Sequence, residues 1–213
     1  MFDVFMFDLD GTLTDPGEGI TNCVMYALKK FGIEETDRTK LYKFIGPPLF
    51  NSFQEYYGFS EEECERAIVY YRERFRDKGI FENEVYENIP EVLMALKNAG
   101  KRIVLATSKA EEFSVRILKH FNIYEYFDFC AGATMDLKRN AKADVIKYAL
   151  ENIDAPDISR VIMIGDRKHD IIGAKDNGLK AIGVLYGYGD RDELENAGAD
   201  YIIDRPENIL EYI

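Results

Sequence analysis

The sequence predicts an α/β fold, doubly wound around a mostly parallel, Rossmann-like sheet, with one inserted domain of α-helices. The main observation is that six short apolar runs, rich in β-branched residues, alternate with segments of helical period. Runs without polar alternation are typical of strands buried on both faces, as in a parallel sheet. The second observation is one long interruption near the N-terminus, which holds helix-like segments and no convincing strand.

The expected strands and helices follow in order along the chain. The six apolar runs are residues 3–7, 102–107, 127–132, 161–165, 181–185 and 201–203. Between them, IPEVLMALKNAG (89–100) ends in a glycine typical of a helix C-terminus, and KADVIKYALEN (142–152) repeats apolar residues one turn apart. Strands that alternate with helices in this way favour a parallel sheet with helices on its faces.

The interruption holds three helix-like segments with charged faces: EGITNCVMYALKKFG (18–32), PPLFNSFQEYYG (47–58) and EEECERAIVYYRERFRDKG (61–79). We expect a helical insertion over residues 16–83 and an α/β core formed by residues 1–15 and 84–213. The Pro and Gly of TDPGEG mark the exit from the core, and FENEVYENIP is the expected return.

Composition limits the classes of function. The net charge of -12 counts against a nucleic-acid surface, because phosphate backbones require basic patches. No apolar run approaches the roughly 20 residues of a membrane helix, and the N-terminus lacks the features of a signal peptide. Three widely spaced cysteines give no disulfide framework and no paired metal motif. We therefore expect a soluble, cytoplasmic protein with reduced thiols.

The stretch FMFDLDGTLTD places two aspartates at the end of the first expected strand. Asp8 and Asp10 lie two residues apart and can converge at the carboxyl end of the sheet, where α/β proteins bind ligands. Two close carboxylates repel each other unless a cation joins them or one is protonated. Gly11 permits a tight turn near a ligand, and Thr12 can hydrogen-bond across it. The alternative is a polar strand end followed by an ordinary Asp-Gly turn.

At this motif, DLDGTLTD, the chain resembles the haloacid dehalogenase-like hydrolase superfamily, in its phosphoglycolate-phosphatase and 5'-nucleotidase-like branch with a helical cap. The resemblance covers essentially the whole chain. It implies that Asp8 attacks phosphorus and forms an aspartyl-phosphate, and that Asp10 acts as general acid and then as general base. It also implies that the backbone carbonyl of Asp10 helps to hold Mg²⁺. A carboxylate attacks an anion poorly unless a metal offsets the charge.

The segment IVLATSKAEEF offers two hydroxyl groups where the resemblance calls for one that binds a phosphoryl oxygen. Ser108 begins SKAE, the S-x-x-E pattern of a capping box, so we expect its side chain to cap the next helix. Thr107, at the strand tip, is therefore the preferred phosphate ligand, with Ser108 retained as a substrate-binding candidate. The first N–H groups of that helix can also face the phosphate.

The segment DLKRNAKADVIKYAL offers three cations, Lys138, Arg139 and Lys142. With Asn140 as the expected N-cap, Lys142 lies in the first helical turn, where the helix dipole disfavours a cation. Such a charge suggests an anion nearby. The family motif also has a lysine at this helix start, which matches Lys142, although the proline that commonly follows is Ala143 here. The alternative is a solvated surface lysine.

The segment VIMIGDRKHD carries two further aspartates after a buried strand. Asp166 and Asp170 are four residues apart, so one helical turn brings both to the same side. With Asp8 they form an oxygen-rich cluster suited to Mg²⁺. The resemblance implies that Asp166 binds the metal directly and Asp170 directly or through water. The alternative for Asp170 is a simple preference of acidic residues for a helix N-terminus. The nearby GYGD sequence lacks the Lys-Ser/Thr of a P-loop, so we expect an ordinary loop.

The resemblance further implies that the insertion closes over the core as a lid. In KFIGPPLFNSF, Lys43 and Gly46 resemble the cap loop that meets the leaving group of the substrate. The few positive charges of this loop favour a small or partly apolar leaving group. Aromatic residues here could stack on a base or sugar, but aromatics at helical spacing are usually core.

Together these features predict a Mg²⁺-dependent phosphatase that hydrolyses a small phosphomonoester, of the phosphoglycolate or nucleoside 5'-monophosphate type, through an aspartyl-phosphate. The partner is a small phosphorylated metabolite rather than a nucleic acid or a membrane. The alternatives are a sugar phosphomutase, a pyrophosphatase, or a non-catalytic interaction protein that retains the fold. A dehalogenase lacks the metal cluster, and a phosphonatase needs a Schiff-base lysine, for which Lys43 is the only suggestive residue. The oligomeric state and the physiological substrate stay open.

Overall fold

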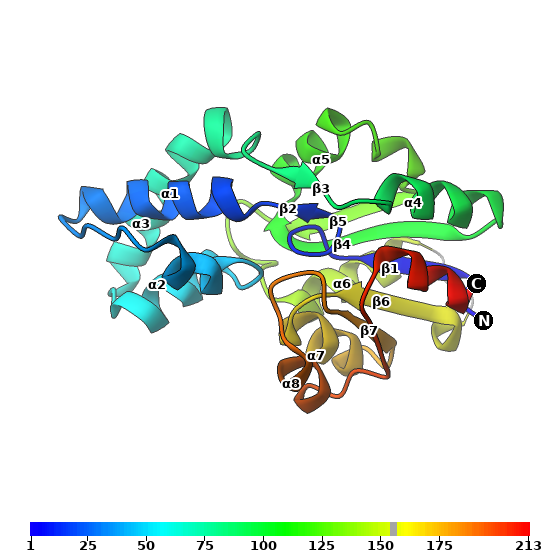
Figure 1. The fold of residues 1–213 in the computed structure, drawn as a ribbon. Helices are drawn as coiled ribbons and strands as arrows, with labels where there is room; N and C mark the ends of the chain where they lie inside the picture. The colour runs from blue at the N-terminus through cyan, green and yellow to red at the C-terminus, as the bar shows by residue number, and fades with distance from the viewer. Residues whose placement is uncertain (154–156) are drawn as a thin grey trace. The chain divides into compact units, whose positions relative to one another are not determined.

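The computed structural model describes residues 1–153 and 157–213. The chain forms two compact units, here called the core unit (Met1–Asp15 and Val85–Ile213) and the insert unit (Pro16–Glu84). Each is described by itself. Figure 1 shows that the insert unit consists mainly of helices, whereas the core unit is a sheet with helices on both faces.

The described part of the core unit is built on a sheet of six strands with the order β5-β4-β1-β6-β7-β8. All neighbouring strands in it are parallel. The strands are β1 (Val4–Phe7), β4 (Arg102–Ala110), β5 (Phe129–Ala133), β6 (Val161–Gly165), β7 (Lys180–Val184) and β8 (Tyr201–Ile203). Each corresponds to one of the six apolar runs, so the predicted α/β class is confirmed. The chain builds outwards from β1 to β5 and then returns to the other side of β1 as β6. In sheets with such a reversal of strand order, ligands generally bind outside the carboxyl ends of the strands.

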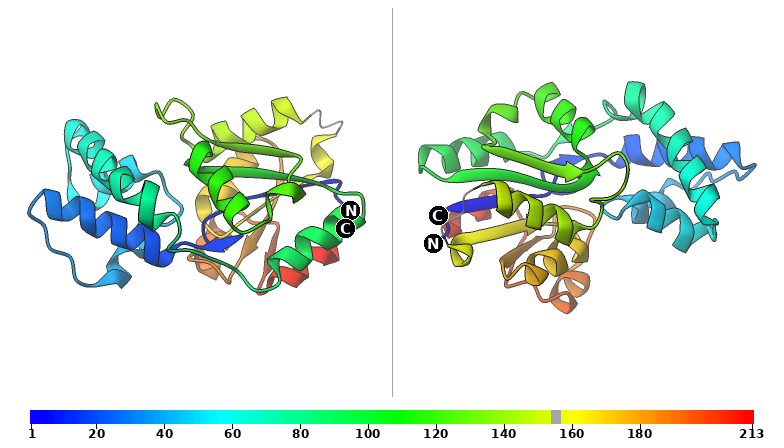
Figure 2. Two further views of the ribbon diagram at one scale, coloured as in Figure 1. Left: turned by 90° about the horizontal axis from the view of Figure 1, so that it is seen from above. Right: turned by 180° about the vertical axis from the view of Figure 1, so that it is seen from behind.

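Helices cover both faces of this sheet, as the two views in Figure 2 show. They are α4 (Ile89–Asn98), α5 (Glu111–His120), α6 (Lys142–Asn152), α7 (Lys168–Asp176), α8 (Arg191–Asn196) and the short 3-10 segments η3 (Tyr124–Tyr126), η4 (Ile158–Arg160) and η5 (Pro206–Tyr212). α6 packs on β4 and β5, and α7 packs on β6 and β7. On the opposite face α4 and α5 pack on β4.

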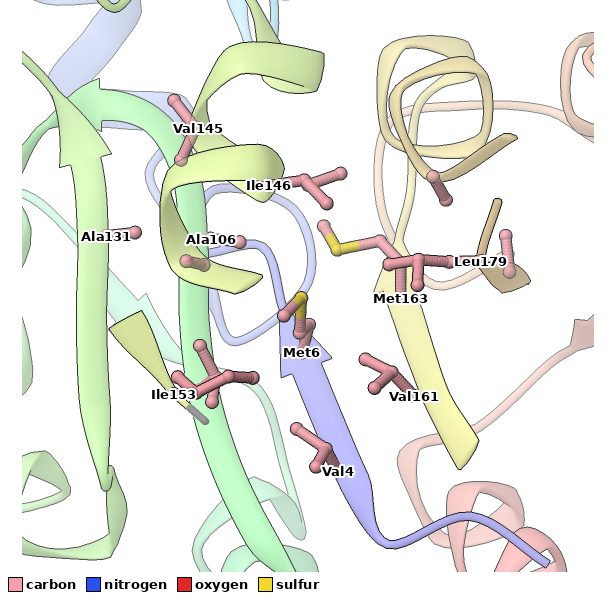
Figure 3. Packing of buried hydrophobic residues seen from close by; sticks show 14 of the residues in the cluster. Val4, Met6, Ala106, Ala131, Val145, Ile146, Ile153, Val161, Met163 and Leu179 are labelled. Carbon is pink, nitrogen blue, oxygen red and sulfur yellow. The ribbon is translucent and has the colours of Figure 1, made fainter. Parts of the chain in front are cut away.

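The core on the α6 and α7 face comes from alternate residues of neighbouring strands. Val4 and Met6 of β1 lie beside Val161 and Met163 of β6, and Ile146 of α6 covers them (Figure 3). All of these side chains are buried. Fully burying a side chain of this size stabilises the fold by about 1.5–3 kcal/mol. This packing fixes the strands that carry the polar residues at their carboxyl ends.

The insert unit consists of α1 (Gly17–Lys30), η1 (Arg38–Phe44), α2 (Leu49–Tyr57), α3 (Glu61–Arg74) and the π-helical turn η2 (Phe75–Gly79). Phe44 and Phe53 are buried, with ring centroids 5.1 Å apart, so these two aromatics are core residues. α3 begins with a capping box in which Ser60 accepts from the N–H of Glu63 and the Glu63 carboxylate accepts from the N–H of Ser60.

Two short strands went unpredicted. β2 (Thr14–Asp15) and β3 (Glu84–Val85) pair with each other. With two residues each, they are too short to produce an apolar run or an alternating pattern in the sequence.

Two expected helix starts are wrong. α5 begins at Glu111 after Ala110, so Ser108 does not cap it and lies inside β4 instead. The reason is non-local: β4 shifts register after Thr107 and pairs again with β5 at Ala110, which keeps the intervening residues extended. The N-cap of α6 is Ala141 rather than Asn140, and no side chain caps this helix.

Among the described helices, none combines the length and the apolar character that crossing a membrane would require.

Candidate active site

The polar residues of the predicted motifs lie at the carboxyl ends of adjacent parallel strands. Asp8 follows β1, Thr107 lies near the end of β4, and Asp166 follows β6. Since β4, β1 and β6 are neighbours in the sheet, these three ends share one edge. All three side chains are buried although they are polar, which requires specific partners.

The loop after β1 is a tight turn held by its own backbone. The carbonyl of Leu9 accepts from the N–H groups of Leu13 and Thr14, and the N–H of Gly11 donates to the carbonyl of Thr14 at 2.8 Å. Gly11 has φ 84°, and a Cβ on it would lie 2.1 Å from Oδ2 of Asp166. Glycine is therefore required here both by the backbone conformation and by the approach of the carboxylate.

Asp8, Asp166 and Asp170 form a buried acidic cluster. One carboxylate oxygen of each lies within 4.8 Å of those of the other two. Burial is the main cause that raises the pKa of Asp166 well above its usual value, and the charges of Asp170 and Asp8 add to it. Burial likewise raises the pKa of Asp170, to about 6. Such a cluster holds three negative charges only if a cation joins them.

Lys142 supplies one positive charge to this cluster. Its Nζ lies 2.7 Å from Oδ1 of Asp8 and 2.7 Å from Oδ1 of Asp170, and it donates to the carbonyl of Ala106 at 3.0 Å. Burial acts to lower the pKa of Lys142, but Asp170 and Asp8 outweigh it and raise the pKa. The anion that we expected beside a lysine in the first turn of a helix is therefore present, as these two aspartates.

The other two cations of that segment point elsewhere. Lys138 is exposed and pairs with Asp136 at 3.2 Å. Arg139 pairs with Glu111 at 2.9 Å and lies 3.6 Å from the ring centre of Tyr148.

Asp10 lies beside a lysine that the sequence analysis did not single out. Its Oδ2 is 2.5 Å from Nζ of Lys109, and the two side chains are 10% and 8% exposed. Burial raises the pKa of Asp10, although the charge of Lys109 opposes the shift. Lys109 was missed because SKAE predicts a helix start, whereas β4 continues and carries Lys109 to the edge of the sheet.

The loop after β7, which contains GYGD, also lies at this edge of the sheet. The sequence had predicted an ordinary loop without a role in the site. The N–H of Tyr188 donates to Oδ2 of Asp166 at 2.8 Å, and the hydroxyl of Tyr186 donates to the carbonyl of Thr12 at 3.1 Å. A Cβ on Gly187 would lie 2.3 Å from the carbonyl oxygen of Gly11. The one available signal was the Gly-Tyr-Gly sequence of residues 187–189, which is separated by two residues from the end of a buried strand.

The hydroxyl groups of Thr12 and Thr107 have different hydrogen-bond partners. Thr12 donates to Oδ1 of Asp166 at 3.5 Å, so it orients a carboxylate. Thr107 is 1% exposed, and its Oγ1 accepts from the N–H of Lys109 at 3.2 Å. Ser108 is partly buried in β4. Lys43 and Gly46 belong to the insert unit, where the ammonium of Lys43 lies 4.0 Å from the ring centre of Tyr56 and Gly46 has φ 100°.

The structure thus combines a parallel sheet with a buried aspartate cluster at its carboxyl edge, in which Lys142 bridges Asp8 and Asp170. The model of the haloacid dehalogenase-like hydrolase family matches residues 5–184. The chain is 46% identical over 189 residues to the 5'-nucleotidase of Pseudomonas aeruginosa PAO1, which covers 89% of this chain and 85% of that protein. It is 36% identical over 197 residues to the tyrosine-protein kinase PtkA of Mycobacterium tuberculosis H37Rv, covering 92% of this chain and 67% of that protein.

Among solved structures, a predicted phosphatase from Clostridium acetobutylicum is 49% identical and superposes with a TM-score of 0.96, covering 99% of each chain. The chain therefore belongs to the haloacid dehalogenase-like hydrolase family. It is an enzyme of the hydrolase class, and the resemblance drawn from its motifs is confirmed.

Proposed function

We propose that this protein is a Mg²⁺-dependent phosphatase that hydrolyses a small phosphomonoester. The observation that carries the proposal is the buried cluster of Asp8, Asp166 and Asp170. Among the described residues, Lys142 is the one cation that forms an ion pair with this cluster. Three carboxylates against one ammonium leave the cluster short of positive charge. Phosphatases and a 5'-nucleotidase among its relatives support the same class of reaction.

The donor set fits Mg²⁺. This ion prefers oxygen ligands and few protein carboxylates, and the cluster offers carboxylate oxygens alone. Apart from the ion pair with Lys142, Oδ1 of Asp8 and Oδ1 of Asp170 have no hydrogen-bond donor among the described residues. Asp8, Asp166 and Asp170, with the backbone carbonyl of Asp10, would hold the ion. When bound, Mg²⁺ supplies the positive charge that lets an anionic nucleophile approach a phosphate.

The reaction consists of two phosphoryl transfers, the first from the substrate to Asp8 and the second from Asp8 to water. The carboxylate of Asp8 attacks phosphorus, and the bond to the leaving oxygen breaks as Asp10 donates a proton to that oxygen. Asp10 then takes a proton from water, whose oxygen attacks the aspartyl-phosphate, releases inorganic phosphate and restores Asp8. The raised pKa of Asp10 suits a group that must carry a proton in the first step. Lys142 and Thr107 hold the phosphoryl oxygens, with Ser108 and the turn at Gly11 and Thr12 beside them.

The insert unit is proposed as the cap over this site. Its bounds, Pro16–Glu84, make it a continuous insertion between β2 and Val85 of the core unit. A cap of this kind excludes water until the phosphorylated aspartate has formed. Lys43 and Gly46 are its proposed contacts with the substrate.

The substrate classes that this proposal allows are phosphoglycolate and a nucleoside 5'-monophosphate. The name of the Pseudomonas relative supports the second. The kinase name of the mycobacterial relative makes an acceptor other than water the main alternative, as in a mutase. A non-catalytic role is opposed by the complete set of Asp8, Asp10, Lys142 and Asp166.

The test is phosphate release from a panel of phosphoglycolate, nucleoside monophosphates, sugar phosphates and pyrophosphate, measured with Mg²⁺ and with a chelator. We expect release from at least one monoester that the chelator abolishes and added Mg²⁺ restores. Conversion of a sugar phosphate without phosphate release would instead assign a mutase. Folded protein with no turnover of any compound would contradict the proposal.

A further inference from the structure

We propose that Lys109 is a specificity-determining residue that binds a second anionic group on the leaving-group side of the substrate. The substrate class is then a phosphate ester or anhydride whose leaving group carries a carboxylate or phosphate close to the bridging oxygen. The inference rests on the proposed function, because it takes Asp10 as the group that protonates the leaving oxygen.

The side chain of Lys109 is almost completely shielded from solvent. Lysine is among the residues least often buried, since its charge needs water or an acceptor. Here the side chain is 8% exposed and ends at the carboxyl edge of the sheet, 2.5 Å from Oδ2 of Asp10. The extension of β4 to Ala110 and its renewed pairing with β5 place it there. The ammonium of Lys109 therefore places a positive charge beside Asp10.

The two carboxylate oxygens of Asp10 have different surroundings. Oδ2 faces Lys109, whereas Oδ1 is buried and has no hydrogen-bond partner in the described part of the chain. Oδ1 is therefore the oxygen available to the leaving group. A leaving oxygen at Oδ1 brings the atoms bonded to it within reach of the ammonium at Oδ2. An ammonium has three N–H donors and can bind Asp10 and a second acceptor together.

Lys142 and Lys109 contact different aspartates of the site. Lys142 joins Asp8 and Asp170, so it lies at the nucleophile and the metal cluster. Lys109 joins Asp10, so it lies at the proton donor. Lys142 therefore binds the phosphoryl group of the substrate, and Lys109 binds its leaving group. This reverses the expectation of an apolar leaving group, which considered only the charges of the insert unit.

A purely supporting role for Lys109 would have a different signature. If the lysine only oriented Asp10, its loss would slow all substrates alike. If it binds an anion, its loss reduces the preference for substrates that carry one. The ratio of kcat/KM values between paired substrates separates the two roles.

The experiment compares phosphoglycolate with ethyl phosphate, which has a similar leaving group without the carboxylate, at saturating Mg²⁺. The native protein should prefer phosphoglycolate at least tenfold in kcat/KM. Lys109→Met should reduce this preference roughly ten- to hundredfold, mainly through a higher KM, because a hydrogen bond to a charged group is lost. Lys109→Arg keeps the charge and should retain part of the preference.

The matched control is Lys101→Met. Lys101 is 13% exposed and pairs with Asp3 at 3.7 Å, at the other end of the strands, so its replacement should leave the preference unchanged. An unaltered preference in folded Lys109→Met, or a native protein that prefers ethyl phosphate, would overturn the inference while leaving the phosphatase intact. Native protein that releases phosphate from no ester at all would instead contradict the proposed function. If Lys109→Met fails to fold, Lys109→Gln, which keeps a hydrogen-bond donor without the charge, takes its place in the comparison.

Discussion

The two units of this protein differ in what they bury. In the core unit, the buried polar residues include five charged ones, Asp8, Asp10, Lys142, Asp166 and Asp170. In the described insert unit, the buried polar residues are Thr21 and Ser52, and both hydroxyls donate to carbonyls of their own helices. Its closest ion pair, Arg74 with Glu82 at 2.7 Å, is partly exposed.

This difference separates stability from function. A hydroxyl that bonds to its own helix costs the fold little, whereas a buried carboxylate loses its hydration and needs a partner. The insert unit is therefore stabilised by packing of aromatic and aliphatic side chains. The core unit tolerates unfavourable buried charge at one edge of its sheet, where we propose the active site. The predictions below test this comparison in order of expected effect.

The largest effect is expected for Asp8→Asn. An amide cannot act as the nucleophile, so kcat should fall by roughly 10³-fold or more. The melting temperature should not fall, because the substitution removes one carboxylate from a crowded acidic cluster and leaves Lys142 paired with Asp170. Phosphate release and thermal unfolding of the same sample check this. A variant that keeps substantial activity would show that Asp8 is not the attacking group.

Phe53→Ala should produce the largest loss of stability. Phe53 is fully buried and its ring stacks on Phe59 at 5.8 Å, so the cavity should cost about 3–5 kcal/mol. Amide hydrogen exchange should show faster exchange within Pro16–Glu84. Phe81→Ala is the control, because Phe81 is 46% exposed. Equal effects of the two substitutions would contradict a packed aromatic core.

Lys142→Met should destabilise the core unit by about 3 kcal/mol in the absence of metal, because it leaves Asp8 and Asp170 without their cation. Added Mg²⁺ should recover part of this loss, since it supplies positive charge to the same carboxylates. Chemical unfolding with and without Mg²⁺ gives both values. A variant as stable as the native protein would mean that the carboxylates are already neutral.

The smallest effect concerns pH. The pKa of Asp166 and that of Asp170 lie above the ordinary value, the latter at about 6. The metal-free folded protein therefore binds protons that the unfolded chain has released, and its stability falls as pH rises from about 4 through about 6. Protons also compete with Mg²⁺. Thermal unfolding should show a Mg²⁺-induced increase of several degrees at about pH 7.5 and little at about pH 5. An equal increase in melting temperature at both pH values would contradict the assignment of Asp166 and Asp170 as Mg²⁺ ligands.

Local patterns in the sequence predicted the sheet and the placing of Asp8, Asp10, Asp166 and Asp170 at its carboxyl edge, because both have local causes. A strand buried on both faces must be apolar throughout, as in residues 161–165, and aspartates after such runs stand out. Lys109 was missed because its position depends on β4 pairing with β5, a contact between segments far apart in the chain. The loop at Gly187 was missed for a similar reason, since its contact with Gly11 spans most of the chain.

The central claim is that Asp8 becomes phosphorylated, and trapping that species tests it most directly. The protein would be mixed with Mg²⁺ and the best ester of the panel, quenched in acid during turnover, and digested for peptide mass spectrometry. The account predicts an added phosphoryl group on the peptide that contains Asp8, absent in Asp8→Asn and without Mg²⁺. Turnover with that peptide unmodified, or modification at another residue, would contradict it.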